Sequence, residues 1–416
     1  MTISNKISPI LRFQKFRNGS DWNMDKFCDL FSILSNNTLS RSELSYGKGS
    51  VYNIHYGDIL IKFNEYLDVA KEDLPYINDK TKADKYKVTY LKDGDVVIAD
   101  TAEDETAGKC TEVTNVGETI AVSGLHTIPC RPQKKFARAY LGYYMNSTVF
   151  HDRLLPIMQG SKVTSIPKSS LQNILLAYPQ DLEEQQKIAE CLSSIDEEIS
   201  AMKEKVEQLK INKKGLMQKL FPVAGKFVPE LRFLEFRDSK DWKATKISDI
   251  FLLTRGNVLS ASAVKDVPTQ EYKYPVYSSQ TLNNGLMGYY NKKLYKDAIT
   301  WTTDGANAGT VRLRLGYFYC TNVCGVLLND SGYANKCISE IIGLRTKEYV
   351  SHVGNPKLMN KVMGEIPITI PPTLSEQQKI AECLSSIDEL ISLYENKVIL
   401  LEQHKKGLMQ QLFPKL

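Results

Sequence analysis

Three cysteines come nearest to a metal site among the residues of this 416-residue chain. Cys320 and Cys324 form a C-x3-C pair, with Cys337 beyond it. Neither a second close cysteine pair nor an H-x3-5-H sequence completes a tetrahedral zinc site. We expect all eight cysteines to be reduced thiols, because disulfides rarely persist in the cytosol, and we expect these three to be small buried residues without a metal.

Motifs for catalysis are also missing from the sequence. The five histidines, at positions 55, 126, 151, 352 and 404, have no spacing typical of a metal or nucleophile site. We find no F-x-G-x-G for a methyl donor, no N/D-P-P-Y/F for amino methylation, no phosphate-binding G-x-x-x-x-G-K-[ST] and no acidic nuclease cluster. The sequence therefore predicts no catalytic residue and no cofactor bound by this chain.

Polar side chains that suit DNA recognition gather in two stretches. Amides and arginines pair with base edges, whereas lysines and hydroxyls suit phosphates. In residues 274–327, strand-like runs alternate with glycine and asparagine turns. The candidate DNA contacts there are Ser278, Ser279, Gln280, Asn283, Thr303, Asp304, Asn307, Arg312 and Arg314. The candidates in the first half are Lys62, Asn64, Thr101, Lys109, Ser161 and Lys162. The alternative is that these residues only form turns.

Composition and length limit how these candidates could bind DNA and what kind of protein carries them. The net charge of +5 disfavours binding by non-specific phosphate attraction alone, but it is compatible with a basic groove on one face. No apolar run approaches the roughly 20 residues that cross a bilayer, and the N-terminus lacks a secretory signal, so we expect a cytoplasmic protein. The length indicates two globular domains with connecting elements.

The chain contains a tandem repeat with unlike centres. EQQKIAECLSSIDE occurs at 184–197 and again at 376–389, and the match extends without a gap over 39 positions, 28 of them identical. A second duplicated piece reads ILRFQKFRNGSDW up to Trp22 and ELRFLEFRDSKDW up to Trp242. The two offsets, 192 and 220, differ by 28, so the first copy has 28 extra residues between the two motifs. Each repeat is a leading segment, a variable middle and a near-constant tail.

Both tails have the hydrophobic period of a long amphipathic helix. Apolar residues recur at alternating steps of four and three, as in a coiled-coil seam. The predicted seam residues are Ile188, Leu192, Ile195, Ile199, Val206 and Leu209 in the first tail, and Ile380, Leu384, Ile387, Ile391, Val398 and Leu401 in the second. Capping-box spacing starts each helix, at Asp181–Glu184 and Thr373–Glu376. About 37 helical residues span roughly 55 Å.

The pairing of the two helices is left open by the sequence. A twofold relation between the repeats would make them antiparallel, a parallel pair is the second arrangement, and two helices that each pack on their own domain are the third. Lys213 and Lys405 interrupt the two seams at equivalent positions. Either they mark where the helices part or admit a partner chain, or each lysine extends to solvent from a frayed end.

These patterns predict an α+β fold with two mixed α/β domains separated by two long helices; the family resemblance described next implies that they are recognition domains and that the two long conserved helices form an antiparallel coiled coil with a pseudo-twofold internal repeat. The expected boundaries are 1–180 for domain 1, with its leading segment at 8–30, and 181–222 for the first helix. Domain 2 is expected at 223–372, with its leading segment at 228–250, and the second helix at 373–416.

The order and duplication of EQQKIAECLSSIDE, of LRF…DW and of YPVYSSQ…DGANAGTV resemble the DNA specificity (S) subunit of type I restriction-modification enzymes over nearly the whole chain. The resemblance implies that each domain reads one half of a bipartite target in double-stranded DNA. It also implies that the helix pair sets the spacer and docks two modification subunits, which methylate adenine, beside two ATP-dependent restriction subunits. S-adenosylmethionine, ATP and Mg are then expected on those partners.

Two other functions compete with this interpretation. The first is a fused enzyme with its own catalytic domain, which the length and the missing motifs disfavour. The second is a coiled-coil scaffold or interaction protein without DNA specificity. If the two coding copies are as similar as the peptides, recombination between them could exchange whole recognition domains.

Overall fold

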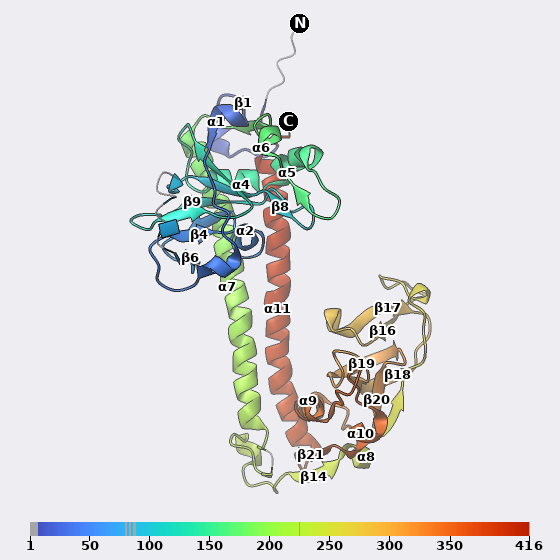
Figure 1. Cartoon of the computed structure of the whole chain (residues 1–416). Helices are drawn as coiled ribbons and strands as arrows, with labels where there is room; N and C mark the ends of the chain where they lie inside the picture. Colours follow the sequence, from blue (N-terminus) through green and yellow to red (C-terminus); the bar gives the residue numbers. More distant parts are fainter. Residues whose placement is uncertain (1–6, 80, 83–84, 86–88, 224, 416) are drawn as a thin grey trace. The chain divides into compact units, whose positions relative to one another are not determined.

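The computed structural model describes residues 7–79, 81–82, 85, 89–223 and 225–415 (Figure 1). The chain forms two compact units. Unit 1 comprises Met1–Met202 with Lys397–Leu416, and unit 2 comprises Lys203–Asn396. Each unit therefore holds one sheet-bearing domain together with a part of both long helices, whereas the sequence divided the chain into consecutive segments. No helix among the described residues is long and apolar enough to cross a membrane.

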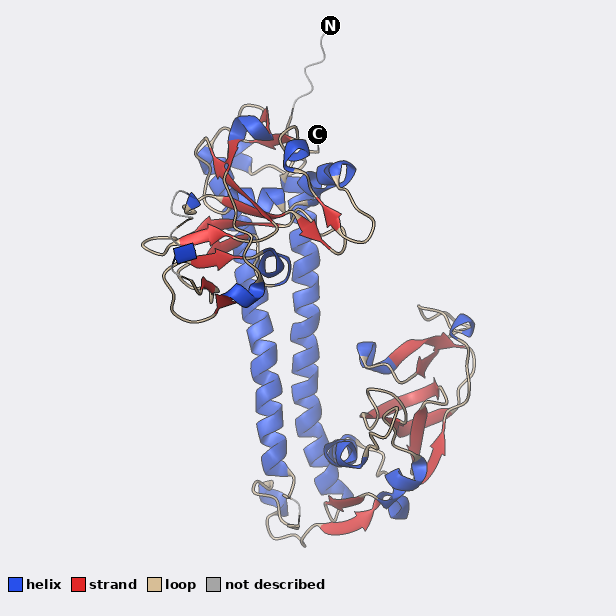
Figure 2. Ribbon diagram, viewed as in Figure 1, coloured by secondary structure: helices blue, strands red, loops and turns tan. Residues whose placement is uncertain are grey.

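Unit 1 contains two main sheets and several short helices (Figure 2). Its strands are β1 (Asn23–Lys26), β2 (Phe31–Ile33), β3 (Leu44–Ser45), β4 (Tyr52–Ile54), β5 (Tyr66–Asp68), β6 (Tyr76–Ile77), β7 (Val96–Ala99), β8 (Thr101–Ala102), β9 (Cys110–Thr114), β10 (Ala121–Ser123), β11 (Thr127–Pro132), β12 (Thr164–Ser165) and β13 (Leu175–Tyr178). Its short α-helices are α1 (Phe27–Leu30), α2 (Tyr56–Ile61), α4 (Tyr140–Met145), α5 (Thr148–Leu154) and α6 (Lys168–Leu171).

The larger sheet of unit 1 has the strand order β2-β11-β7-β9-β5, and the smaller has the order β10-β4-β6-β3. Every residue of β7 and β9 is buried, which explains why β7 is apolar throughout, whereas β9 also buries Thr111, Glu112 and Thr114. α2 packs on β7 and α4 packs on β9. Gly142 lets α4 approach the backbone just before β5, because a Cβ atom there would lie 1.9 Å from the carbonyl oxygen of Glu65.

Unit 2 is built around one six-stranded sheet of order β15-β20-β18-β19-β16-β17. Its strands are β14 (Lys243–Lys246), β15 (Leu252–Arg255), β16 (Tyr274–Tyr277), β17 (Leu286–Tyr290), β18 (Tyr295–Thr302), β19 (Val311–Cys320), β20 (Cys324–Leu328) and β21 (Pro367–Ile370). Its short helices are α8 (Ile247–Ile250), α9 (Lys336–Thr346) and α10 (Asn360–Glu365). α9 packs on β19 and β21 and closes the core around Trp301.

The duplicated sequence forms the same frame in both units. After the tryptophan of each leading segment comes a strand that pairs, antiparallel, with the strand just before the long helix. In unit 1 Asn23 lies opposite Tyr178, and in unit 2 Lys243 lies opposite Ile370, which are the same positions at offsets of 220 and 192. The 28 extra residues of the first repeat are therefore accommodated entirely inside its domain.

The two conserved helices are α7 (Leu182–Leu220) and α11 (Leu374–Leu412). Within unit 1, Asp196 pairs with Lys405 and Glu198 with Lys397. Within unit 2, Lys210 pairs with Glu395 and Lys213 with Asp388. A later residue of α7 meets an earlier residue of α11 in each unit, so the helices are antiparallel (Figure 1).

The twelve predicted seam residues are all buried or half-buried. Unit 1 holds Ile188, Leu192, Ile195, Ile199, Val398 and Leu401, and unit 2 holds Val206, Leu209, Ile380, Leu384, Ile387 and Ile391. The first residues of each helix also belong to a domain core, because Ile188 and Leu192 join the main cluster of unit 1 and Ile380 and Leu384 that of unit 2. Each helix thus packs on its own domain as well as on the other helix.

Candidate nucleic-acid interface

The two duplicated motifs meet each other at the start of each long helix. Arg12 donates from Nε and Nη2 to the two carboxylate oxygens of Glu184, at 2.7 Å each, and Trp22 donates from Nε1 to the same carboxylate at 3.3 Å. In unit 2, Arg232 and Trp242 bind Glu376 in the same way, at 2.7, 2.8 and 3.1 Å. Glu184 and Glu376 are both 1% exposed. We call each Arg–Glu–Trp set a clamp.

The clamp corrects the predicted capping boxes. The side chains of Asp181 and Thr373 accept from the backbone N–H groups of Glu183 and Glu376, so one half of each cap is present. The Glu184 and Glu376 carboxylates bind an arginine and a tryptophan rather than the helix backbone. A bidentate arginine ion pair is stronger than a cap to a neutral N–H, which explains the different partner.

The glutamine after each clamp glutamate fixes the variable domain. Gln185 accepts from the backbone N–H of Ala137 at 2.9 Å and donates to the Pro179 carbonyl at 2.8 Å. Gln377 accepts from the Asn335 side chain at 2.9 Å, and Asn335 also caps α9 by accepting from Ile338 N–H. The conserved EQ pair thus holds the leading segment with one side chain and the domain with the other.

Lys405 and Lys213, the residues that interrupt the two seams, form a second pair of equivalent sites. Lys405 Nζ lies 2.6 Å from Asp196 Oδ1 and 2.6 Å from Glu65 Oε1. Lys213 Nζ lies 2.7 Å from Asp388 Oδ1 and 2.9 Å from Glu340 Oε1. In each site, which we call a lysine lock, one carboxylate comes from the other long helix and one from the variable domain.

The locks correct the interpretation of these lysines as side chains that extend to solvent from a frayed helix end. Lys405 and Lys213 are only 12% and 17% exposed, and both are held by carboxylates within their own unit. The seam is interrupted because three elements converge there, and an ammonium group with three donors can join them.

The two locks differ in their charge balance. In unit 2, Lys336 adds a second ammonium group, 2.8 Å from Glu340 and 2.7 Å from Asp388. Burial opposes ionisation of these two carboxylates, but hydrogen bonds and attraction from the two lysines lower the pKa of both. In unit 1, burial and the neighbouring Glu65 carboxylate raise the pKa of Asp196 despite the presence of Lys405. The first lock is therefore short of positive charge.

The DNA-contact candidates of unit 1 lie on two elements. Lys62 and Asn64 follow α2 and are exposed, and Lys62 donates to the Asp73 carbonyl and lies 5.9 Å from the Tyr46 ring centroid. β12 follows the exposed Ser161–Lys162 loop and pairs with β8, which begins at Thr101. Thr101 donates to Asp100 at 2.8 Å.

The candidates of unit 2 fall into two groups. Ser278, Ser279, Gln280 and Asn283 lie in the connection between β16 and β17, where Asn283 and Asn284 have positive φ angles of 48° and 55°. Asp304 and Asn307 lie half-buried in the connection between β18 and β19, and Arg312 is half-buried on β19. Gln280 and Asn283 are exposed; the Gln280 side-chain nitrogen donates to the Leu286 carbonyl, so its side-chain oxygen and the Asn283 amide are best placed to reach a partner.

Three of the predicted DNA contacts have internal partners in the structure. Thr303 is 0% exposed and donates to Asp304 and to the Val323 carbonyl. Lys109 is half-buried and donates to the Leu60 carbonyl at 3.0 Å, and burial lowers the pKa of its ammonium group. Arg314 is buried, donates to Thr300 at 3.1 Å and stacks at 3.6 Å on the Tyr277 ring. Residue type alone could not show that these polar atoms have internal partners.

The cysteine and histidine candidates show no joint site. Cys320, Cys324 and Cys337 are buried, and burial raises the pKa of each thiol. Within the part of the chain that the structure describes, no three His, Cys, Asp or Glu side chains are grouped as metal ligands.

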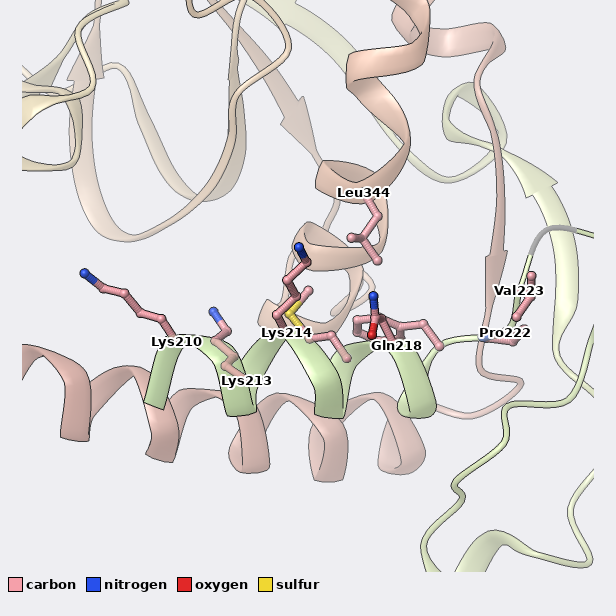
Figure 3. A pocket seen from close by; sticks show the side chains of 9 residues that line it. Lys210, Lys213, Lys214, Gln218, Pro222, Val223 and Leu344 are labelled. Atoms are coloured by element: carbon pink, nitrogen blue, oxygen red, sulfur yellow. The ribbon is translucent and has the colours of Figure 1, made fainter. Parts of the chain in front are cut away.

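A largely apolar pocket of about 550 Å³ lies at the last turns of α7 (Figure 3). Its lining includes Met217, Phe221, Val223 and Leu344, with Lys210, Lys213 and Lys214 beside them. In unit 1 the equivalent Met409 and Phe413 are buried, and Phe413 packs against the rings of Tyr140 and Tyr144. The same helix end therefore packs against a different domain in each unit.

The similarity of this chain to known proteins also divides between its two repeats. The model of the type I restriction modification DNA specificity domain matches residues 19–210 and 239–403, one match for each repeat. Two Mycoplasma pneumoniae proteins named as type I specificity subunits are 38% identical over 157 and 147 residues. The matched parts cover 37% and 35% of this chain, and 42% and 76% of those relatives, so the chain spans less than half of the first.

One solved structure has a similar fold along nearly the whole chain. The crystal structure of a type I restriction-modification S subunit from M. genitalium superposes with a TM-score of 0.64 over 99% of this chain and 100% of that one. The two sequences are 16% identical, so the likeness concerns the fold.

Proposed function

This chain belongs to the family of the type I restriction modification DNA specificity domain, and from this premise we propose that it reads a bipartite target in double-stranded DNA, one half with each recognition domain. The observation that carries the proposal is the contrast within each repeat. The clamp, the strand pair before the helix and the lysine lock are alike in both units, whereas the sheets that they hold differ. Two different DNA-binding domains, each held by the same clamp, strand pair and lysine lock, suit a target with two different half-sites.

The helix pair has a separate role in the proposal. It fixes the number of unspecified base pairs between the half-sites and offers its exposed faces to modification subunits, two in number, which methylate adenine. Two ATP-dependent restriction subunits complete the complex. The antiparallel pairing of α7 and α11 supports this role, because a twofold-related pair presents equivalent faces to two equal partners.

The chemistry in this proposal belongs to the partners. S-adenosylmethionine, ATP and Mg are assigned to the modification and restriction subunits. The duplicated carboxylates support this division, because Glu184, Glu376, Asp196 and Asp388 are all engaged in clamps or locks. The specificity subunit then contributes base recognition and geometry rather than a reacting group.

Mapping of methylated adenines tests the proposal. The gene is expressed with its modification subunit in cells that lack other methylation, and the target motif is read from the genome. We expect one split motif, and we expect Gln280→Ala with Asn283→Ala to change only one half of it. A chain that acts as a scaffold without DNA specificity would give methylation that does not depend on these residues.

A further inference from the structure

A group of lysines and tyrosines gathers across three neighbouring strands of the unit 2 sheet, β18, β19 and β16, and has no role in the fold described above. Lys293 Nζ lies 3.6 Å from the Tyr317 ring centroid, and Lys296 Nζ lies 5.4 Å from it. Tyr317 meets Tyr274 edge to face at 6.3 Å, and Lys273 Nζ lies 5.3 Å from the Tyr274 ring. We call these five residues the lysine–tyrosine cluster.

Strand pairing assembles the cluster from three separate segments. Tyr274 begins β16, Lys293 and Lys296 lie in the turn and first residues that lead into β18, and Tyr317 lies on β19. β16 and β19 are neighbours in the sheet, and β18 lies on the other side of β19. The lysine side chains lie against the tyrosine rings, which restrict their motion. Less conformational entropy is therefore lost when an ammonium group binds an anion.

The ammonium groups of the cluster are available to a ligand. Lys273, Lys293 and Lys296 are exposed, and Tyr317 is 45% exposed. Lys296 lies 3.5 Å from Asp297, whose carboxylate also accepts from Gly316 N–H. Among the residues that the structure describes, no carboxylate lies within ion-pair distance of Lys273 or Lys293.

The cluster also has a fixed relation to a predicted base-reading turn. Tyr274 lies opposite Tyr290 at the base of the β16–β17 hairpin, while Gln280, Asn283 and Asn284 lie at its tip. β16 covers about 10 Å from Tyr274 to Tyr277 at roughly 3.3 Å per residue, and the tip lies beyond it. The major groove of B-DNA is about 12 Å wide, so a tip in the groove places the base of the hairpin near a flanking phosphate strand.

We propose that the lysine–tyrosine cluster binds the phosphodiester backbone beside the half-site that the β16–β17 tip reads. The proposal rests on the function proposed above. Compact ammonium groups suit phosphate oxygens, and phosphate contacts set the register of a protein on DNA without reading its sequence. Lys273 and Lys293 therefore contribute affinity and salt dependence, whereas Gln280 and Asn283 contribute sequence choice.

The test compares Lys273→Gln/Lys293→Gln with wild type in the full complex with the modification subunit. Affinities for a target duplex and for a random duplex are measured between 50 and 200 mM salt. Each lost phosphate contact lowers the slope of log affinity against log salt by about 0.9. The double variant should therefore lose affinity for both duplexes alike, and should lose about 12-fold less than wild type when the salt is raised fourfold.

Three further variants separate the possible causes. Lys246→Gln removes the same charge from β14, where the ammonium group pairs with Glu365, and it should leave the slope unchanged. Tyr317→Phe keeps the ring and should behave like wild type, whereas Tyr317→Ala should lower the affinity for both duplexes. Asn283→Ala should change the target sequence with an unchanged slope.

The outcomes distinguish the two proposals. If the slope of log affinity against log salt is unchanged in the double lysine variant and the target is still recognised, the cluster does not bind phosphates. The proposed function is then unaffected. A change in the half-site sequence in that variant also overturns the proposal for the cluster, because phosphate contacts do not choose bases. If the wild-type complex binds target and random duplexes equally, the proposed function itself fails.

Discussion

Removal of the lysine from each lock should destabilise the two units to different degrees. Lys405→Met leaves Asp196 and Glu65 next to each other, at 20% and 18% exposure. Lys213→Met leaves Asp388 and Glu340 with Lys336, whose ammonium group lies within 2.8 Å of both. The same substitution at equivalent positions therefore leaves two carboxylates without an ion-paired lysine among the described residues in unit 1, and two carboxylates that share one lysine in unit 2.

The magnitude follows from burial and from the remaining partners. Loss of one member of a fully buried ion pair costs about 3–5 kcal/mol, and loss of an exposed one costs about 0–1 kcal/mol. The carboxylates of the first lock are mostly buried but touch solvent, so Lys405→Met should cost about 2–3 kcal/mol. Lys213→Met should cost about 1 kcal/mol, because Lys336 still forms an ion pair with both carboxylates.

Hydrogen exchange measures the two units separately within one chain. Slowly exchanging amides of β7 and β9 report on unit 1, and those of β18 and β20 report on unit 2. Lys187→Met is the matched control, since its pair with Glu190 on α7 is about half exposed and should change the opening free energy by less than about 0.5 kcal/mol. If Lys213→Met costs as much as Lys405→Met, the charge-balance argument is wrong.

Three further predictions follow. Burial raises the pKa of Glu112 to about 7 from 4.5, so stability from this group is fully present below pH 4.5 and falls by up to about 3 kcal/mol as the pH rises to 7; Glu112→Gln should flatten that dependence in unit 1 hydrogen exchange. The lowered pKa values of Asp388 and Glu340 stabilise unit 2 above their ordinary range, and this stability is lost on acidification; Asp388→Asn should reduce that loss, as followed by exchange at β18. Arg232→Met leaves the buried Glu376 without its ion-pair partner and should cost about 3 kcal/mol in denaturant unfolding, whereas Lys15→Met, at an exposed pair, should cost less than about 0.5 kcal/mol.

The repeated frame could be predicted from the sequence because its parts are duplicated. The near-identical tails and the LRF…DW pieces predicted the two long helices and the two domains, and the shared seam period favoured helices that pair. The strand register at Asn23 and Lys243 follows the same two offsets. What the duplication could not show is that Arg12 and Glu184, far apart in the chain, hold each other.

The parts that were not predicted depend on residues without a shared pattern. Glu65 and Glu340 serve equivalent lysines, yet one precedes a strand and the other lies within a helix. The lysine–tyrosine cluster joins residues that meet only when β16 and β19 pair. Thr303 and Arg314 were predicted as DNA contacts because their types suit bases or phosphates, and only the packed structure shows their internal partners.

In each repeat, the leading segment and the long helix need the same two contacts from the domain that lies between them in the chain. The leading segment and the helix supply the clamp, but the domain itself must supply a donor for the EQ glutamine and a carboxylate for the lysine. Domain 1 meets this demand with the Ala137 N–H and Glu65, and domain 2 with Asn335 and Glu340. The two domains differ in fold and supply these contacts from different residues. What matters is therefore where the donor and the carboxylate lie, not which residues surround them in the sequence. Exchange of whole domains by recombination in the conserved tails, which we propose on the strength of the identical peptides, would preserve the clamp in every product and would leave each domain to provide its own two contacts.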